Sequence, residues 1–198
     1  MVMAEATNHY FKHLGVSDGL SQVCIPSIYQ DELGAVWLGT TEGLNRYNGK
    51  DVKVFQPSES NHGLTNNEIN ELCGDKNGRM YIRSGNDLIK LDIYTEQFTC
   101  LRQKGVYGLF CKKDTLWVSC ADGIYYYTGQ GTELTFFARV QKGFVGRALY
   151  VDKETVWVVT RKYLVAISRE DPLRQEILLT LDKGNCILGD SSGNIWVG

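Results

Sequence analysis

The chain has 198 residues, a formal net charge of −2 and a hydrophobic content of 43%, values typical of a folded domain rather than a disordered segment. The small acidic charge gives no indication of nucleic acid as a partner, because proteins that bind it carry basic patches for the phosphates. No stretch approaches the roughly 20 apolar residues that span a bilayer. We therefore expect this segment to reach a membrane only through regions that would follow residue 198.

Residues 1–8 are set apart from the fold that follows. Ala4-x-Ala6 resembles the small-residue site at which signal peptidase cuts, although no basic region or long apolar run precedes it. Two interpretations stay open, the remnant of a signal or an added start with a chance match. Residues 9–14 then form an isolated strand in which Phe11 matches Phe55, the end of the first full unit described next.

Residues 9–198 contain a unit of about 40 residues that recurs four times and starts a fifth time. An aromatic residue marks the second strand of every unit, and all four tryptophans of the chain fall on this position. These marker residues are Trp37, Tyr81, Trp117, Trp157 and Trp196. The units extend over about 21–56, 65–102, 105–138, 144–180 and 184–198.

Each unit shows the same order of short strands. The first strands are expected at 23–29, 69–73, 106–111, 145–151 and 186–188. In three units an Asp-x-x-Gly turn follows, because aspartate can accept hydrogen bonds from its own downstream backbone and glycine can take a positive φ. The aspartates of these turns are Asp31, Asp75 and Asp190. Their regular place before an apolar strand favours the turn role over metal ligation, so no metal site is expected.

A third and a fourth strand complete each unit as an antiparallel meander, and no segment shows the 3.6-residue period of a helix. One such sheet cannot cover both of its faces, whereas sheets repeated radially cover one another. The sequence therefore predicts an all-β protein, a β-propeller fragment of four four-stranded antiparallel blades plus the start of a fifth.

Six cysteines, Cys24, Cys73, Cys100, Cys111, Cys120 and Cys186, form no CxxC pair. Because most lie among β-branched or aromatic residues, we expect small buried apolar side chains rather than zinc ligands. A disulfide remains an alternative, and the sequence does not indicate which cysteines would pair.

The first unit closely resembles the two-component-regulator propeller repeat, through Gly19-Leu20, the turn 31–34, Val36-Trp37-Leu38-Gly39-Thr40 and 43–47. The end of the chain, 190–198, repeats the pattern, whereas units two to four depart from it. The resemblance implies an N-terminal sensor segment of a hybrid two-component system sensor histidine kinase/response regulator. It also implies a periplasmic location and an oligosaccharide ligand, with the kinase outside this segment.

We identify no catalytic constellation and expect no cofactor. His9, His13 and His62 are expected at the surface, and acidic pairs such as Glu59 with Glu68 or Asp182 with Asp190 belong to no recognisable motif. A propeller enzyme, such as a lyase or hydrolase, and a protein-interaction scaffold remain the alternatives to a sensor.

Ligand binding is expected where loops enter the innermost strands at a mouth of the central channel. Amide and guanidinium groups suit sugar hydroxyls, although such groups also cap strands in any propeller. The candidates are Ser21, Gln22, Asn66, Asn67, Arg147 and Asn185. The run Tyr125-Tyr126-Tyr127 could stack on a sugar, but at least one of its rings is expected between blades. An incomplete ring also exposes sheet edges, so we expect the fragment to associate with itself.

Overall fold

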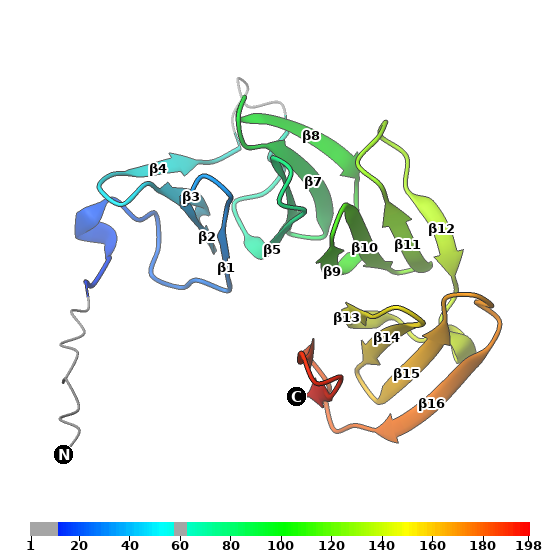
Figure 1. Ribbon diagram of the computed structural model, residues 1–198. Coiled ribbons are helices and arrows are strands. Elements are labelled where there is room, and N and C mark those ends of the chain that lie inside the picture. The colour runs from blue at the N-terminus through cyan, green and yellow to red at the C-terminus, as the bar shows by residue number, and fades with distance from the viewer. Residues whose placement is uncertain (1–11, 58–62) are drawn as a thin grey trace, which may run out of the picture.

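The computed structural model describes residues 12–57 and 63–198 and contains five antiparallel sheets arranged as an arc (Figure 1). Four sheets have four strands each, in the chain order β1-β2-β3-β4 and its equivalents, and the last has two. The prediction of four blades plus the start of a fifth is confirmed. Two 3₁₀ turns, η1 (Val16–Asp18) and η2 (Gln141–Gly143), are the helical elements of the described residues.

The strands are short and follow one another as hairpins. The first blade contains β1 (Ser27–Gln30), β2 (Val36–Thr40), β3 (Gly43–Tyr47) and β4 (Val52–Phe55). The second contains β5 (Ile69–Gly74), β6 (Arg79–Ser84), β7 (Asp87–Asp92) and β8 (Gln97–Arg102). The third contains β9 (Val106–Lys112), β10 (Thr115–Cys120), β11 (Gly123–Tyr127) and β12 (Thr135–Ala138). The fourth contains β13 (Gly146–Val151), β14 (Thr155–Thr160), β15 (Tyr163–Ser168) and β16 (Gln175–Thr180), and the fifth β17 (Ile187–Gly189) and β18 (Ile195–Val197).

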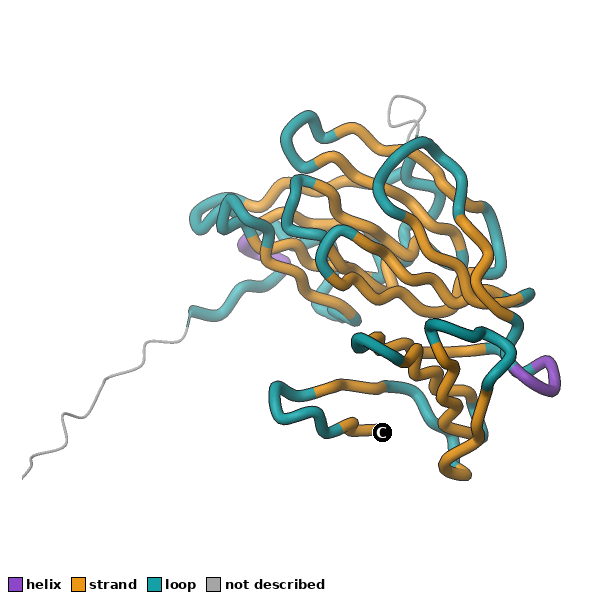
Figure 2. Tube along the Cα trace, turned by 45° about the vertical axis from the view of Figure 1, so that its right-hand side comes forward, coloured by secondary structure: helices purple, strands orange, loops and turns teal. Residues whose placement is uncertain are grey.

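The first strand of each blade lies on the concave side of the arc. Contacts between consecutive blades join β1 to β5, β5 to β9, β9 to β13 and β13 to β17. Figure 2 shows the same sheets stacked one after another from the side. The hairpins therefore run outward from a common axis, as in a propeller.

The apolar core lies between the blades. Trp37 and Leu44 of the first blade, both fully buried, pack with Ile69 and Met80 of the second. A second cluster joins blades two and three around Tyr81 and Tyr127, and a third joins blades three and four. Of the three tyrosines 125–127, Tyr127 is buried between blades, as the alternation of side chains predicts.

The repeated aspartate has a second role beside the turn. Asp31 accepts the backbone N–H groups of Leu33 and Ala35 through Oδ1 and the indole N–H of Trp37 through Oδ2, at 2.8 Å. Asp190 accepts the indole N–H of Trp196 in the same way, at 3.1 Å. The turn role is confirmed, and the aspartate also fixes the marker tryptophan.

Blade four contains the same hydrogen bonds to an aspartate turn, but the turn has no glycine. Asp152 accepts the indole N–H of Trp157 at 2.7 Å and the backbone N–H groups of Glu154 and Thr155. The Asp-x-x-Gly pattern missed this aspartate because its turn is one residue shorter. In blade two, by contrast, Asp75 pairs with Arg79, and the hydroxyl of Tyr81 is buried without a partner.

Some expectations for loops and cysteines were wrong. The first strand begins at Ser27 rather than residue 23, because Pro26 lacks the N–H that a ladder needs. Cys24 therefore lies in an exposed loop, and Cys186 is also exposed, whereas Cys120 is buried as expected.

Half of the isolated N-terminal strand, 9–11, lies outside the described residues, and so do residues 1–8. Residues 12–14 are described and belong to no strand. The Lys12 ammonium instead donates to the Tyr47 hydroxyl of the first blade at 3.0 Å. A closing role for residues 9–14 stays a prediction.

Candidate functional site

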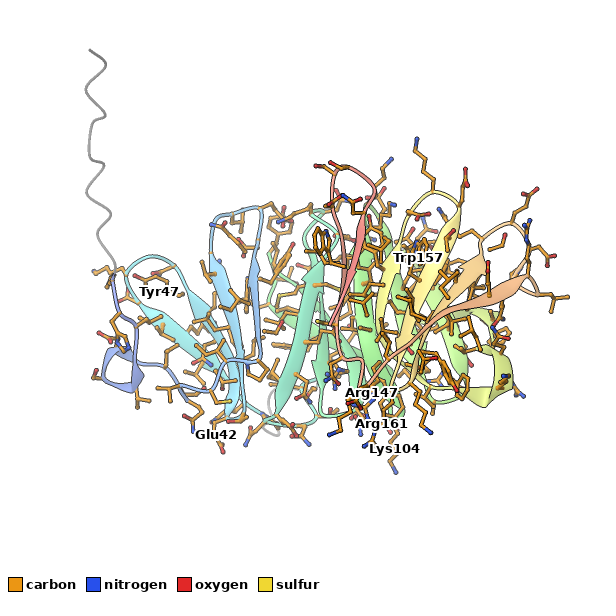
Figure 3. All side chains as sticks on the ribbon, turned by 90° about the horizontal axis from the view of Figure 1, so that it is seen from below. Glu42, Tyr47, Lys104, Arg147, Trp157 and Arg161 are labelled. Atoms are coloured by element: carbon orange, nitrogen blue, oxygen red, sulfur yellow. The ribbon has the colours of Figure 1, made fainter. Side chains whose placement is uncertain are left out.

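The two ends of the blades form two different faces. One, the Asp-turn face, carries the loops between the first and second strands. The other, the crossover face, carries the loops that connect one blade to the next and the turns between the second and third strands. Figure 3 shows Glu42, Lys104, Arg147 and Arg161 together on the crossover face, with Tyr47 and Trp157 toward the opposite side.

A cavity of about 400 Å³ opens on the crossover face between the innermost strands of blades three and four. Its wall consists of Tyr107, Phe144, Val145, Arg147, Thr160, Arg161 and Lys162. Its size falls in the range of ligand pockets, about 300–1,000 Å³. Three of the residues in its wall are cationic and none is acidic.

Each element supplies a different kind of group to this cavity. Tyr107, from β9, is 38% exposed, and Phe144, in the loop before β13, packs against Tyr163 with 4.8 Å between ring centroids. Arg147 is exposed at an irregularity of β13, where the pairing with β14 shifts register between Gly146 and Ala148. The cavity thus combines aromatic surface with charge.

The cations of the cavity are free to bind a ligand. Within the described residues, the side chains of Arg147, Arg161 and Lys162 have no hydrogen-bond or ion-pair partner. On the same face Arg102 differs, because it is paired with Asp122 at 2.7 Å. Unpaired guanidinium groups offer fork-shaped donors that match carboxylate and sulfate groups.

The residues singled out from the sequence lie on the crossover face, but several of them have structural partners. The Ser21 hydroxyl bonds Thr40 and accepts from the buried Asn45. Gln22 accepts the N–H of Val23, and Asn66 accepts the N–H of Glu68. These three side chains therefore fix loops.

The other three sequence candidates keep unpartnered side chains. Asn67, Arg147 and Asn185 make no side-chain hydrogen bond within the described residues, and Arg147 lines the cavity. Of the histidines, His13 is exposed as expected, whereas His9 and His62 lie outside the described residues, as does Glu59.

Arg147 was the one residue of the cavity wall singled out from the sequence, and the aromatic and charged residues that were missed are Tyr107, Phe144, Arg161 and Lys162. One signal could have found the last two. The turn between the second and third strands holds Thr41-Glu42, Gly85-Asn86 and Ala121-Asp122 in the first three blades, but Arg161-Lys162 in the fourth. Because the other three blades have no cation at this turn, the fold does not require Arg161 and Lys162, which favours a functional role for them.

A second cavity, of about 490 Å³, opens beside Trp117 and Tyr126 on the Asp-turn side of blades three and four. Its groups are already engaged with one another. The Trp117 ring packs on Tyr126 and Phe137, and the Arg169 guanidinium donates to the carbonyls of Asp152 and Lys153. The crossover-face cavity is therefore the better candidate for a ligand site.

The comparisons with known proteins agree with the repeat. Residues 19–42 match the family model of the two component regulator propeller. The first blade carries a two-component-regulator propeller repeat. The chain is also 40% identical over 53 residues to Histidine kinase P4 of Formosa agariphila, a match that covers 27% of this chain and 4% of the relative.

Solved structures show the same fold. The extracellular domain of a hybrid two component system of B. thetaiotaomicron, BT3049, superposes with a TM-score of 0.81 at 23% identity, over 94% of this chain and 29% of that one. The extracellular domain of a one component system of the same organism, BT4673, gives 0.78 at 19% identity, over 96% and 30%. Virginiamycin B lyase of Staphylococcus aureus gives 0.68 at 11% identity, over 88% and 62%. The chain spans less than a third of the length of the first two structures.

Proposed function

We propose that this propeller segment is the non-catalytic, periplasmic sensing part of a hybrid two-component regulator and that it binds an oligosaccharide at the crossover-face cavity. The observation that carries the binding proposal is the cavity itself, with aromatic rings and unpaired cations in one wall. The two-component-regulator repeat of residues 19–42 and the extracellular domains of similar fold support a sensor. The histidine kinase activity would belong to other regions of the parent protein.

The chemistry of the cavity favours an acidic sugar over a neutral one. Tyr107 and Phe144 offer apolar ring surface to the face of a pyranose. Arg147 and Arg161 have no carboxylate partner of their own, so an acidic ligand would form charge-assisted hydrogen bonds without first breaking an ion pair. The expected ligand is an oligosaccharide that carries uronate or sulfate groups.

An enzyme is the alternative, since the propeller fold also serves a lyase. Hydrolysis or elimination of a sugar needs a general acid or base held within hydrogen-bond reach of the reacting atom. The wall of the crossover-face cavity holds no carboxylate, histidine or thiol among the described residues, so an enzyme would have to use Tyr107 or Lys162 as its general acid or base. Turnover of the sugar distinguishes the two functions.

None of the helices in the described residues is long and apolar enough to cross a membrane.

The binding proposal is tested by calorimetry with matched pairs of sugars. The probes are a hexagalacturonate and its methyl ester, and a sulfated galactan oligosaccharide and its desulfated form. We expect binding of at least one acidic member and weaker binding of its neutral counterpart. Binding only of neutral sugars would contradict the acidic preference, and binding of no sugar in a wide oligosaccharide array would contradict sensing of glycans.

The same mixtures test the enzyme alternative. After prolonged incubation, mass spectrometry of the sugars is expected to show no shortened product, and release of unsaturated or hydrolysed fragments would establish an enzyme. Arg174→Ala provides the matched control for cavity variants, because Arg174 is an exposed arginine on the opposite face whose side chain has no partner among the described residues.

We also propose that the 198-residue chain associates with itself. Leu188 and Trp196 of the two-stranded sheet are 64% and 62% exposed, an apolar surface that a further blade or a second copy would cover. Light scattering at rising protein concentration is expected to show a mass above that of one chain. A constant monomer mass would overturn this proposal without affecting the ligand site.

A further inference from the structure

Two cysteines meet between the second and third blades. Cys73 lies on β5 and Cys111 on β9, the innermost strands of neighbouring blades, which contact each other. Their Sγ atoms are 2.7 Å apart, although the residues are 38 positions apart in the chain. This pairing could not be read from the spacing of the six cysteines.

The distance is short for two thiols that are merely packed together. Non-bonded carbon atoms rest about 3.5–4.0 Å apart, and sulfur is larger than carbon. A disulfide bond measures about 2.05 Å and needs two cysteines on nearby backbones whose side chains point toward each other. Both cysteines are half-buried, and no other pair of cysteines in the described residues is in such contact.

The surroundings offer the two sulfurs no other role. Within the described residues, no group of three or more histidine, cysteine, aspartate or glutamate side chains could hold a metal ion. The nearby hydroxyls of Tyr29 and Tyr81 are buried and have no partner among the described residues, so neither bonds a sulfur. A covalent link would add to the hydrogen bond that joins β9 to β5 from the Leu109 N–H to Glu71.

We propose that Cys73 and Cys111 form a disulfide that joins the second blade to the third. Each thiol loses one hydrogen, the two sulfurs form one bond, and a dithiol–disulfide oxidant or oxidised glutathione takes up the two electrons and two protons as its own thiols. Oxidising compartments such as the periplasm maintain bonds of this kind.

The bond is expected to form while the blades assemble. Burial, followed by the hydrogen bond to Cys111, raises the pKa of the Cys73 thiol well above its usual value, so the folded protein holds little of the thiolate that attacks a disulfide. Once formed, the disulfide would be equally protected from reductants. It lies between β5 and β9, whereas the ligand cavity lies between β9 and β13, so ligand binding and the bond can fail independently.

Peptide mapping of the protein exported to the periplasm tests the proposal directly. The protein is purified without reductant, denatured with iodoacetamide and cut with trypsin. Cys73 falls in the peptide 54–76 and Cys111 in the peptide 105–112. We expect these two peptides as one species, two hydrogens lighter than their sum, which separates on reduction. Alkylation of both cysteines in the protein, including after refolding with oxidised glutathione, would overturn the proposal.

Thermal unfolding provides a second measurement. A closed loop of 38 residues predicts that reduction lowers the melting temperature by on the order of 10 °C. The double variant Cys73→Ser/Cys111→Ser is expected to be insensitive to reductant, whereas the control Cys100→Ser keeps the full response. A wild-type protein that melts at one temperature with and without reductant would contradict the bond.

Discussion

The Asp-turn face and the crossover face differ in how far they follow the repeat. On the Asp-turn face, Asp31, Asp152 and Asp190 each accept an indole N–H and backbone N–H groups. The same hydrogen bonds therefore fix the turn and the marker tryptophan in three blades. On the crossover face, Arg161 and Lys162 of one blade have no cationic counterpart in the turns of the first three. The comparison indicates that the repeated residues maintain the fold, and it supports our proposal that the departure from the repeat marks a ligand site.

The largest effect on stability is expected from replacing a marker tryptophan that an Asp turn holds in place. Trp37 is fully buried between the first two blades and receives its orientation from Asp31. Trp37→Ala should lower the free energy of unfolding by about 3–5 kcal/mol, since the cavity left behind cannot collapse completely. Urea denaturation checks this, with Leu173→Ala as a control because Leu173 is 92% exposed. An equal loss of unfolding free energy in the two variants would contradict a structural role for the marker tryptophan.

Asp31 itself should matter next. Asp31→Asn places an amide N–H opposite the indole N–H of Trp37, where no acceptor remains. The expected loss is about 1–3 kcal/mol, the cost of leaving a buried donor without a partner. The exposed Asp51→Asn serves as the control in the same denaturation series. A loss below that of the control would show that the turn does not depend on the charge.

The marker of blade two is a tyrosine, which allows a buried hydroxyl without a partner to be compared with one that has a partner. Tyr81 and Tyr127 pack edge to face at 6.0 Å. The Tyr81 hydroxyl has no partner among the described residues, whereas the Tyr127 hydroxyl donates to the carbonyl of Gly131 and accepts from the Lys90 ammonium. Tyr127→Phe should cost about 1 kcal/mol. Tyr81→Phe should be neutral or stabilising by a similar amount, since it removes an unsatisfied buried hydroxyl. Thermal unfolding of the two variants in parallel checks the opposite signs.

The smallest effect is a pH dependence. Burial alone would raise the pKa of the Asp152 carboxyl. Hydrogen bonds from the Trp157 indole and from backbone N–H groups together have the larger, opposite effect, so the pKa in the folded protein lies below the ordinary value. Because the pKa of Asp152 is lower in the folded protein, its ionised carboxylate stabilises the fold at pH values above the unfolded pKa of about 3.9. This contribution is lost as the pH falls through the folded pKa. The stability difference between wild type and Asp152→Asn should therefore exist at pH 6 and shrink below pH 4. A difference that stays constant over this range would contradict the assignment.

Much of the fold could be predicted from the sequence because each blade repeats local chemistry. The spacing of Trp37, Trp117, Trp157 and Trp196 and the Asp-x-x-Gly turns indicate strands and hairpins without long-range information. The cavity could not be predicted in the same way. Tyr107 and Arg161 are distant in the chain and meet only when two blades stack. Arg147 was identified because it enters an innermost strand, whereas Ser21 and Asn66, chosen on the same grounds, bind backbone or side-chain partners instead.

The central claim, that one face maintains the fold while the other binds the ligand, is tested most directly by measuring both properties on the same variants. Calorimetry with hexagalacturonate or the sulfated galactan, whichever binds wild type, is combined with urea denaturation of Arg147→Ala/Arg161→Ala and of Asp152→Asn. The account predicts that the arginine variant loses at least about 10-fold in affinity, the equivalent of one charge-assisted hydrogen bond, and keeps wild-type stability. Asp152→Asn should lose stability and keep its affinity. Unchanged affinity in the arginine variant, with wild-type binding established, would contradict the assignment of the crossover face.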